Sequence, residues 1–332
     1  MIRFWFLFSL IFSIIFGKDF YEGDSLIEAG VHAFYNYEFD KATDILTIGR
    51  EKYPNHPGVH MIWAAAKWVQ AKAIYSTERS NEVLENDLAS IKPIYEILSK
   101  TYAYDPNYRL YQGSSIGLSA RVTLGKKQWI RTFYRAYLGF SILNDIAENH
   151  PHIYDINLPI GIIEYYCGIS NSVLKWIVKA YGMNPSIESG LNKIEIAAEE
   201  GTWSWIEAKG ILSYLYLWVE EEPILAFKHA KDLVRNFPNN FYFNILYLES
   251  IIRTDSKIEI PIIVDNLNEM YNRLTPRQKE WYLPYLNYEK ALVFFYQKDY
   301  KKTIEYLDLT INNYSAELDI ILGNAFLLRG MT

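Results

Sequence analysis

The sequence predicts an all-α fold, an α-solenoid of stacked antiparallel helix hairpins. The first observation is a repeated spacing of a small residue, an alanine-like residue about a dozen positions later and a proline about twelve further on, with a period of roughly 34 residues. The second is that helical patterns follow one another with no credible strand pair and no low-complexity linker. The three copies contain Gly30, Ala33, Ala42, Leu46, Gly49 and Pro54; Ser213, Tyr216, Ala226, Ala230, Leu233 and Pro238; and Ala291, Phe294, Thr303, Leu307 and Thr310.

Length and composition narrow the class of protein. The chain has 332 residues, half of them hydrophobic, which is enough for one extended repeat array or two compact domains. The net charge of −6, from 33 basic and 39 acidic residues, argues against nucleic acid as the main partner, because such proteins usually carry a strongly basic surface. Cys167 is the only cysteine, so the chain has no intramolecular disulfide and no cysteine cluster for a metal.

Residues 1–17 have the pattern of a secretory signal peptide. Arg3 is followed by an apolar run from Phe4 to Phe16, and Gly17 offers a small residue for cleavage. The run is shorter than the roughly 20 residues that span a membrane comfortably. We therefore expect export to the periplasm or cell envelope, with an uncleaved N-terminal membrane anchor as the alternative.

The first half of the remaining chain, residues 18–150, is expected to form three helix pairs. Prolines mark their ends, at Pro54, Pro106 and Pro151, because the residue before a proline disfavours helix. Gly125 marks the turn inside the third pair. The expected helices cover residues 24–36 and 39–53, 57–76 and 81–104, and 107–124 and 127–149.

The second half, residues 151–332, is expected to continue the same solenoid. Residues 152–158 are the most loop-like stretch of the middle and mark the weakest boundary between the two halves. One helix is expected from Pro159 to about residue 180, and Thr275 is expected to cap a helix that follows Pro276. The remaining expected helices cover 187–200, 203–219, 223–237, 240–253, 258–274, 277–296, 299–314 and 316–329.

At the repeat positions the chain resembles the tetratricopeptide repeat superfamily. The likeness is fair in residues 24–56, 203–238 and 285–316, and it is loose between 57 and 200, where the helices are longer. The segments Leu158–Gly161, Gly190–Leu191 and Ala197–Gly201 are similar to exported bacterial proteins that carry divergent repeats of this kind. This second likeness implies an envelope-associated protein that is not an enzyme and has no catalytic residues.

Stacked hairpins leave a concave inner face that usually holds an extended peptide or a partner helix. We therefore expect a scaffold that binds a protein or peptide on that face, with no cofactor, no metal and no nucleic acid. Two alternatives are left open. One is a secreted carbohydrate-active enzyme shaped as a helical toroid, with paired carboxylates facing each other at the centre of a closed ring. The other is a structural subunit of an outer-membrane or secretion assembly.

The candidate partner-binding residues are basic and aromatic. Arg131 and Arg135 are four apart on one helix face. The aromatic residues of the same stretch are Trp129, Phe133, Tyr134 and Tyr137. Such a patch can contact an acidic partner or an anionic membrane surface, while the simpler interpretation is a solvated face whose arginines pack on aromatic rings. Tyr216 is expected on the face opposite Tyr214, where it can line the groove. The candidate residues are Arg121, Lys126, Lys127, Arg131, Arg135 and Tyr216.

The histidine pairs have simpler explanations than a metal site. His56 and His60 have the spacing of ligands on one helix face, but Pro57 between them places His56 outside the helix. We therefore expect both to be ordinary surface or capping histidines. His150 and His152 lie in a loop and are interpreted in the same way.

The remaining reactive residue types are also assigned to structure. Cys167 is expected to be buried in an apolar helix, because a catalytic thiol needs a partner base and partial exposure. The acidic clusters Glu199–Glu200 and Glu220–Glu222 lie near helix ends and are assigned to capping and solvation. The chain has no phosphate-binding glycine loop, no nucleophile elbow and no dinucleotide fingerprint, which removes the common enzyme classes.

Overall fold

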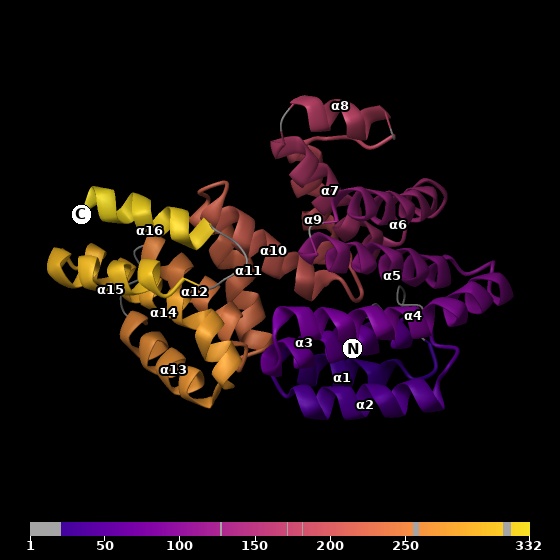
Figure 1. Ribbon diagram of the computed structural model, residues 1–332, viewed down its shortest axis with the longest axis horizontal. Helices are drawn as coiled ribbons and strands as arrows, with labels where there is room; N and C mark the ends of the chain where they lie inside the picture. Colours follow the sequence, from indigo (N-terminus) through magenta and orange to yellow (C-terminus); the bar gives the residue numbers. More distant parts are fainter. Residues whose placement is uncertain (1–20, 127, 171, 181, 255–258, 315–319) are drawn as a thin grey trace, which may run out of the picture.

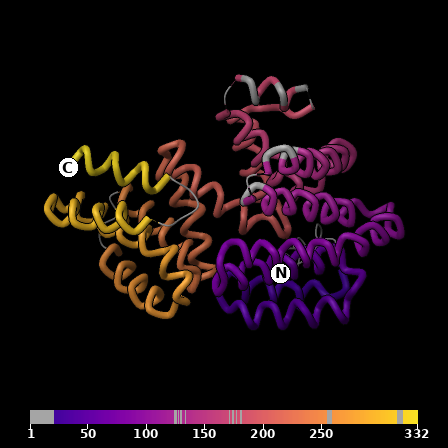
Figure 2. The backbone as a smooth tube through the Cα atoms, viewed as in Figure 1, coloured from indigo at the N-terminus to yellow at the C-terminus, as the bar shows by residue number. Residues whose placement is uncertain are grey.

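The structure is a computed structural model that describes residues 21–332 except 127, 171, 181, 255–258 and 315–319; at 124, 125, 129, 130, 133, 173, 174, 177 and 180 it describes the backbone alone. The expected signal peptide lies outside the described residues. Within them the fold is all-α, without a strand, and most helices pack against the next helix along the chain. Figure 1 shows the helices, and Figure 2 traces the same path from the N-terminal hairpin to the last helix on the other side of the molecule.

The helices follow one another with short connections. In chain order they are α1 (Asp24–Tyr35), α2 (Phe39–Lys52), α3 (Val59–Ile74), α4 (Thr77–Thr101), α5 (Pro106–Gly125), α6 (Trp129–Asn149), the 3-10 helix η1 (Tyr154–Ile156), α7 (Asn157–Ile169), α8 (Ser172–Ala180), α9 (Ile187–Glu200), α10 (Trp205–Trp218), α11 (Pro223–Asn236), α12 (Phe241–Arg253), α13 (Ile260–Arg273), α14 (Pro276–Tyr296), α15 (Tyr300–Asn312) and α16 (Ile320–Met331).

Most of these helices lie close to their expected positions, and the expected cap at Thr275 is confirmed. Its side chain accepts a hydrogen bond from the Gln278 backbone N–H (3.1 Å), and the Gln278 side chain accepts one from the Thr275 N–H (3.1 Å). This reciprocal pair satisfies two donors that a helix start leaves free.

The single helix expected from Pro159 to about residue 180 is instead two helices, α7 and α8. The chain turns at Ser170, whose backbone is extended and whose hydroxyl donates to the Cys167 carbonyl (2.6 Å). Just before this turn, the Cα of Gly168 lies so close to the chain at Ile187 that a Cβ there would be 2.6 Å from the Ile187 nitrogen. A contact with a segment farther along the chain therefore fixes the end of α7, and local spacing could not predict it.

The repeat positions are the core positions of the hairpins. In α1 and α2, Ala33, Ala42 and Leu46 are buried, and a Cβ on Gly30 would lie only 2.7 Å from the Leu46 side chain. In the second copy, Ser213, Tyr216, Ala226, Ala230 and Leu233 are buried, as are Ala291, Thr303, Leu307 and Thr310 of the third. The small residues let neighbouring helices approach closely, as stacked hairpins require.

Three hydrophobic clusters run along the solenoid. The first spans residues 27–122, the second spans residues 110–183 and the third spans residues 158–328. The second cluster contains Leu110 and Phe140 from one side of the 152–158 stretch and Ile160 and Val178 from the other. This stretch therefore lies within one continuous core.

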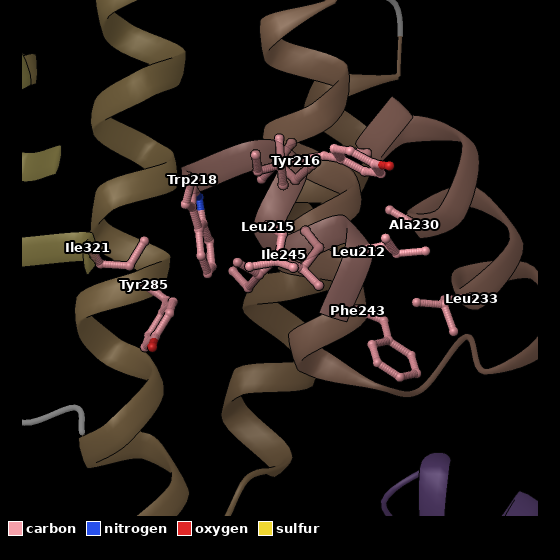
Figure 3. Packing of buried hydrophobic residues seen from close by; sticks show 14 of the residues in the cluster. Leu212, Leu215, Tyr216, Trp218, Ala230, Leu233, Phe243, Ile245, Tyr285 and Ile321 are labelled. Atoms are coloured by element: carbon pink, nitrogen blue, oxygen red, sulfur yellow. The ribbon is translucent and has the colours of Figure 1, made fainter. Parts of the chain in front are cut away.

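The third cluster is built around the end of α10, as Figure 3 shows. The ring of Trp218 faces that of Tyr285 from α14, with centroids 6.1 Å apart, and Ile321 reaches the same space from α16. Three helices that are far apart in sequence thus share one packed centre, which ties the C-terminal hairpins together.

The solenoid curves until its first hairpin touches the C-terminal half. Tyr37, in the turn between α1 and α2, shares a hydrogen bond with the Tyr282 hydroxyl (2.9 Å), and Asn240 donates to the Tyr35 carbonyl (2.8 Å). The Thr275 hydroxyl donates to the carbonyl of Ala73 at the end of α3. We call this contact, between α1–α3 and α12–α14, the seam.

The seam covers part of the concave face that was expected to be open. Val31 and Tyr35 of α1 pack against the third hydrophobic cluster, and the Tyr35 ring lies 5.3 Å from Phe237 and 6.0 Å from Phe243. The first hairpin therefore turns aromatic side chains toward the C-terminal half and buries them there, because this removes apolar surface from water. The inner face of this hairpin is covered by the chain itself.

Candidate functional site

Three of the predicted basic residues surround one carboxylate. Lys126 donates to Glu85 of α4 (2.5 Å). That hydrogen bond, with the charges of Lys126, Arg135 and Arg131, holds the pKa of Glu85 below its usual range. Lys126 thus pairs with Glu85 next to the turn between α5 and α6, and Arg131 and Arg135 of α6 act on the same carboxylate through their charge. Lys127 lies outside the described residues.

The basic residues differ in their exposure to solvent. Arg135 is half-buried and donates to the Ser119 carbonyl (3.1 Å), so it braces α6 against α5. Arg121, Lys126 and Arg131 are exposed, and the charge of Arg121 opposes the rise that burial causes in the pKa of Tyr166 on α7. Arg131 and Arg135 were expected to share one face. Instead, Arg131 faces solvent and Arg135 packs against α5.

Tyr216 does not line a groove. It is 7% exposed and lies in the third hydrophobic cluster, where Figure 3 shows its ring directed toward α11. Its hydroxyl donates to Glu195 (2.8 Å), and its ring stacks on His229 with centroids 6.1 Å apart. Burial raises the pKa of Tyr216. The expectation that it faces a partner is wrong, because it fills the interface between α10 and α11.

Large aromatic side chains are exposed on the helices next to the basic residues. Arg131, Tyr134 and Leu138 follow one another on the outer face of α6, with Tyr134 61% exposed. Tyr166 of α7 is 45% exposed and Trp176 of α8 is 73% exposed. These three helices lie together in one corner of the molecule (Figure 1). We call Arg121, Arg131, Tyr134, Tyr166 and Trp176 the basic–aromatic face.

His56 and His60 are both buried, so the surface position expected for them is wrong, whereas His56 does have a capping role at the start of α3. The His56 Nε2–H donates to Asp24 (2.7 Å), and its Nδ1 accepts from the Gly58 N–H (3.1 Å), so the ring is neutral and satisfied on both sides. Burial lowers the pKa of His56 and of His60. Their role is to fasten the first hairpin to the start of α3.

Cys167, the acidic clusters and the His150–His152 pair, which the sequence assigned to structural roles, lie in different environments. Cys167 is half-buried in α7, and burial raises the pKa of its thiol, which disfavours the reactive thiolate. Glu222 is the N-cap residue of α11 and is exposed, although its side chain makes no capping hydrogen bond. Glu220 instead accepts a hydrogen bond from the Tyr165 hydroxyl (2.5 Å). His150 and His152 contact each other edge to face, with ring centroids 5.9 Å apart.

A small cavity lies at the seam. Its volume is about 290 Å³, and its lining combines the apolar Phe241 and Met270 with the polar Asn36, Glu38 and Arg273. Pockets for drug-sized ligands range from about 300 to 1,000 Å³. This cavity is therefore at the lower limit for a small molecule and too small for an extended peptide.

A buried pair of glutamates lies between α12 and α14. Glu249 and Glu289 are both fully buried, with Trp218 donating to Glu249 (2.5 Å) and Arg253 donating to the same carboxylate (2.6 Å). Burial, followed by the neighbouring charge of Glu249, raises the pKa of Glu289 well above its usual range. A glycosidase needs its two carboxyl groups on either side of a substrate, and this pair is enclosed in the core.

Comparison with other proteins gives no family assignment. No protein-family model matches the chain, and no curated protein matches it. In the described residues, none of the helices combines the length and the apolarity that crossing a membrane requires.

Proposed function

We propose that this protein is a non-catalytic scaffold of the bacterial cell envelope, a divergent tetratricopeptide-repeat protein that binds another protein through its basic–aromatic face. The observation that carries the proposal is the exposure of Tyr134 one helical turn from Arg131 on α6, together with the exposure of Trp176 on α8. Tryptophan, tyrosine and arginine are the side chains that most often dominate the binding energy of protein interfaces.

The chemistry of this face favours an acidic partner segment. Arg121 and Arg131 are exposed, and α8 adds Lys175 and Lys179 one helical turn apart. Arginines next to aromatic rings bind carboxylates through forked hydrogen bonds while the rings cover apolar stems. The basic–aromatic face replaces the concave face as the proposed docking surface, since the chain covers the inner side of the first hairpin.

The carbohydrate-active toroid receives less support. Its paired carboxylates would have to meet at an accessible centre, whereas Glu249 and Glu289 are enclosed among Trp218, Arg253 and the α12–α14 packing. Export rests on the pattern of residues 1–17. A structural subunit of an envelope assembly differs from the proposed scaffold in the permanence of its complex, which co-purification measures.

A triple variant with Arg131→Glu, Tyr134→Ala and Trp176→Ala tests the proposed face. We expect the wild-type chain to retain a partner from an envelope fraction and the variant to retain at least about tenfold less, because truncation of one hot-spot residue costs 2 kcal/mol or more. Quantitative mass spectrometry of the eluates measures the ratio.

The matched control changes equally exposed apolar side chains elsewhere. Ile97→Ala and Ile262→Ala remove side chains that are 64% and 63% exposed and lie on α4 and α13. This variant should retain the partner as the wild type does. Equal loss in both variants, or turnover of a carbohydrate by the wild-type chain, would contradict the proposal.

A further inference from the structure

Three potential metal ligands meet between α9 and α11. Glu195 and Glu199 are one turn apart on α9, and His229 comes from α11. One ligand atom from each residue lies within 4.8 Å of the others. We call these residues the Glu–Glu–His cluster. Because Glu195 and His229 are 34 residues apart, no local motif reveals the cluster, and the histidine pairs considered from the sequence do not include it.

Two members of the cluster are already held in position. The His229 side chain is 1% exposed, and its Nε2 lies 3.1 Å from a Glu195 carboxylate oxygen. Tyr216 donates to the same oxygen (2.8 Å), and its ring stacks on the imidazole at an interplanar angle of 12°. A buried imidazole directed at an oriented carboxylate is a preorganised pair of nitrogen and oxygen ligands.

The spacing of this pair fits a small divalent ion. Zinc binds histidine nitrogen and carboxylate oxygen at about 2.0–2.2 Å, which places two ligand atoms of a tetrahedral site about 3.2–3.6 Å apart. The distance of 3.1 Å between His229 and Glu195 is close to that value. Glu199 is exposed, so its carboxylate can close the remaining distance by rotation of its side chain.

The hydrogen bonding of the His229 ring also permits metal binding. Its Nδ1 is buried and has no hydrogen-bond partner among the described residues. A shift of the ring proton from Nε2 to Nδ1 therefore breaks no hydrogen bond at Nδ1, and it frees the Nε2 lone pair for the ion. The metal would take the place of the Nε2 proton that now contacts Glu195.

Lys228 forms an ion pair with Glu199 and would compete with a metal ion for this carboxylate. The Lys228 ammonium lies 2.9 Å from Glu199, and the two side chains are 61% and 45% exposed. Exposed ion pairs of this kind contribute little to stability. A divalent ion bound by three protein ligands can therefore displace the ammonium.

The geometry points to a zinc site formed by Glu195, Glu199 and His229, at which the ion clamps α9 to α11. These two helices lie on either side of α10 in the chain and belong to successive hairpins, so the clamp reinforces the stacking there. The imidazole ligand favours zinc and related transition ions over magnesium and calcium, which prefer sites made of oxygen ligands alone. The cluster and the basic–aromatic face lie on different helices.

Titration of the purified, tag-free chain with zinc chloride tests this inference. We expect calorimetric binding of one ion and a rise in Tm of several degrees when zinc is in large excess over its Kd. Glu199→Gln should weaken binding at least tenfold, because loss of a supporting residue outside the ligand set alone costs about 10- to 100-fold. Lys228→Gln should tighten binding, because it removes the competing cation.

The matched control is Glu200→Gln, the same chemical change at the exposed neighbouring residue. It should bind zinc as the wild type does. Absence of heat and of a Tm shift in the wild type would overturn the inference, as would equal losses in the Glu199→Gln and Glu200→Gln variants. Equal stabilisation by magnesium or calcium would also overturn it, because that outcome indicates unspecific attraction to acidic side chains.

Discussion

Gly190→Ala is expected to destabilise the protein by about 3 kcal/mol or more, because α7 and α9 meet backbone to backbone. A Cβ on Gly190 would lie 2.6 Å from the nitrogen of Tyr165 and 2.7 Å from the carbonyl oxygen of Gly161. Neither atom belongs to a flexible side chain, so the helices would have to separate. Separation would loosen the buried contacts of Tyr165 and Ile194 in the third hydrophobic cluster.

Thermal and urea unfolding measure this effect. The expected fall in Tm is at least about 5 °C, given the few degrees per kcal/mol of a protein of this size. Gly323→Ala is the control, since a Cβ there meets nothing within 4 Å. It should be neutral or raise stability by up to about 1 kcal/mol, the helix-propensity gain of alanine over glycine. Equal stability of the two variants would refute the close approach of α7 and α9.

Glu289→Gln is expected to stabilise the protein increasingly as the pH rises. Neither Glu289 oxygen accepts a hydrogen bond from a described donor, and the Glu249 carboxylate lies beside it. The protonated carboxyl can donate to Glu249, and a glutamine amide can do the same without a titrating proton. The glutamine therefore keeps a hydrogen-bond donor to Glu249. It also removes the free-energy cost of keeping a carboxyl group at position 289 protonated at neutral pH.

The sign follows from the raised pKa of Glu289 in the folded protein. The contribution of Glu289 to the free energy of unfolding is fully present below the pKa of this side chain in the unfolded chain, about 4.3 for glutamate. It is lost as the pH rises through the higher pKa that Glu289 has in the folded protein. Between these two pKa values the stability of the wild type should fall by about 1.4 kcal/mol per pH unit relative to the variant. Urea unfolding at several pH values measures both slopes.

Glu269→Gln makes the same chemical change at an exposed position on α13 and should leave the slope of the wild type unchanged. If Glu289→Gln were less stable than the wild type by a constant amount at every pH, the raised pKa of Glu289 in the folded protein would be disproved.

The fold class and most helices followed from the sequence because their causes are local. Proline at Pro54 and Pro106, and the capping pair of Thr275 with Gln278, act within a few residues and leave visible patterns. The small repeat residues, such as Ala42 and Ala226, correctly predicted core positions. Stacked hairpins need a small residue at each point where two helices approach closely, so the same residue type returns in each repeat.

The seam could not be predicted, because its contacts join residues about two hundred positions apart. Thr275 contacts the carbonyl of Ala73, and Tyr37 contacts Tyr282, without any pattern that relates the two segments. A shorter-range contact that no pattern announced also holds His56, which bonds to Asp24 at the start of α1, 32 positions earlier. A superhelix whose first hairpin contacts α12–α14 requires a curvature that single repeats do not specify.

The candidate site was predicted in part. The basic turn between α5 and α6 was visible as a charge cluster, and Tyr134 accompanied it. Tyr216 was misplaced although the sequence contained the correct signal, since it occupies the repeat position that the buried Ala33 holds in the first copy. Trp176 was missed because α8 was expected to be the end of a longer helix, and the turn at Ser170 is what sets its orientation.

Site-specific photo-crosslinking in living cells tests the proposed docking surface most directly. A photoreactive amino acid in place of Trp176 should join the protein to one partner through an acidic segment of that partner, and the same amino acid in place of Ile262 on α13 should give no such product. Absence of an adduct at position 176, or the same set of adducts at both positions, would contradict the assignment of partner binding to the basic–aromatic face.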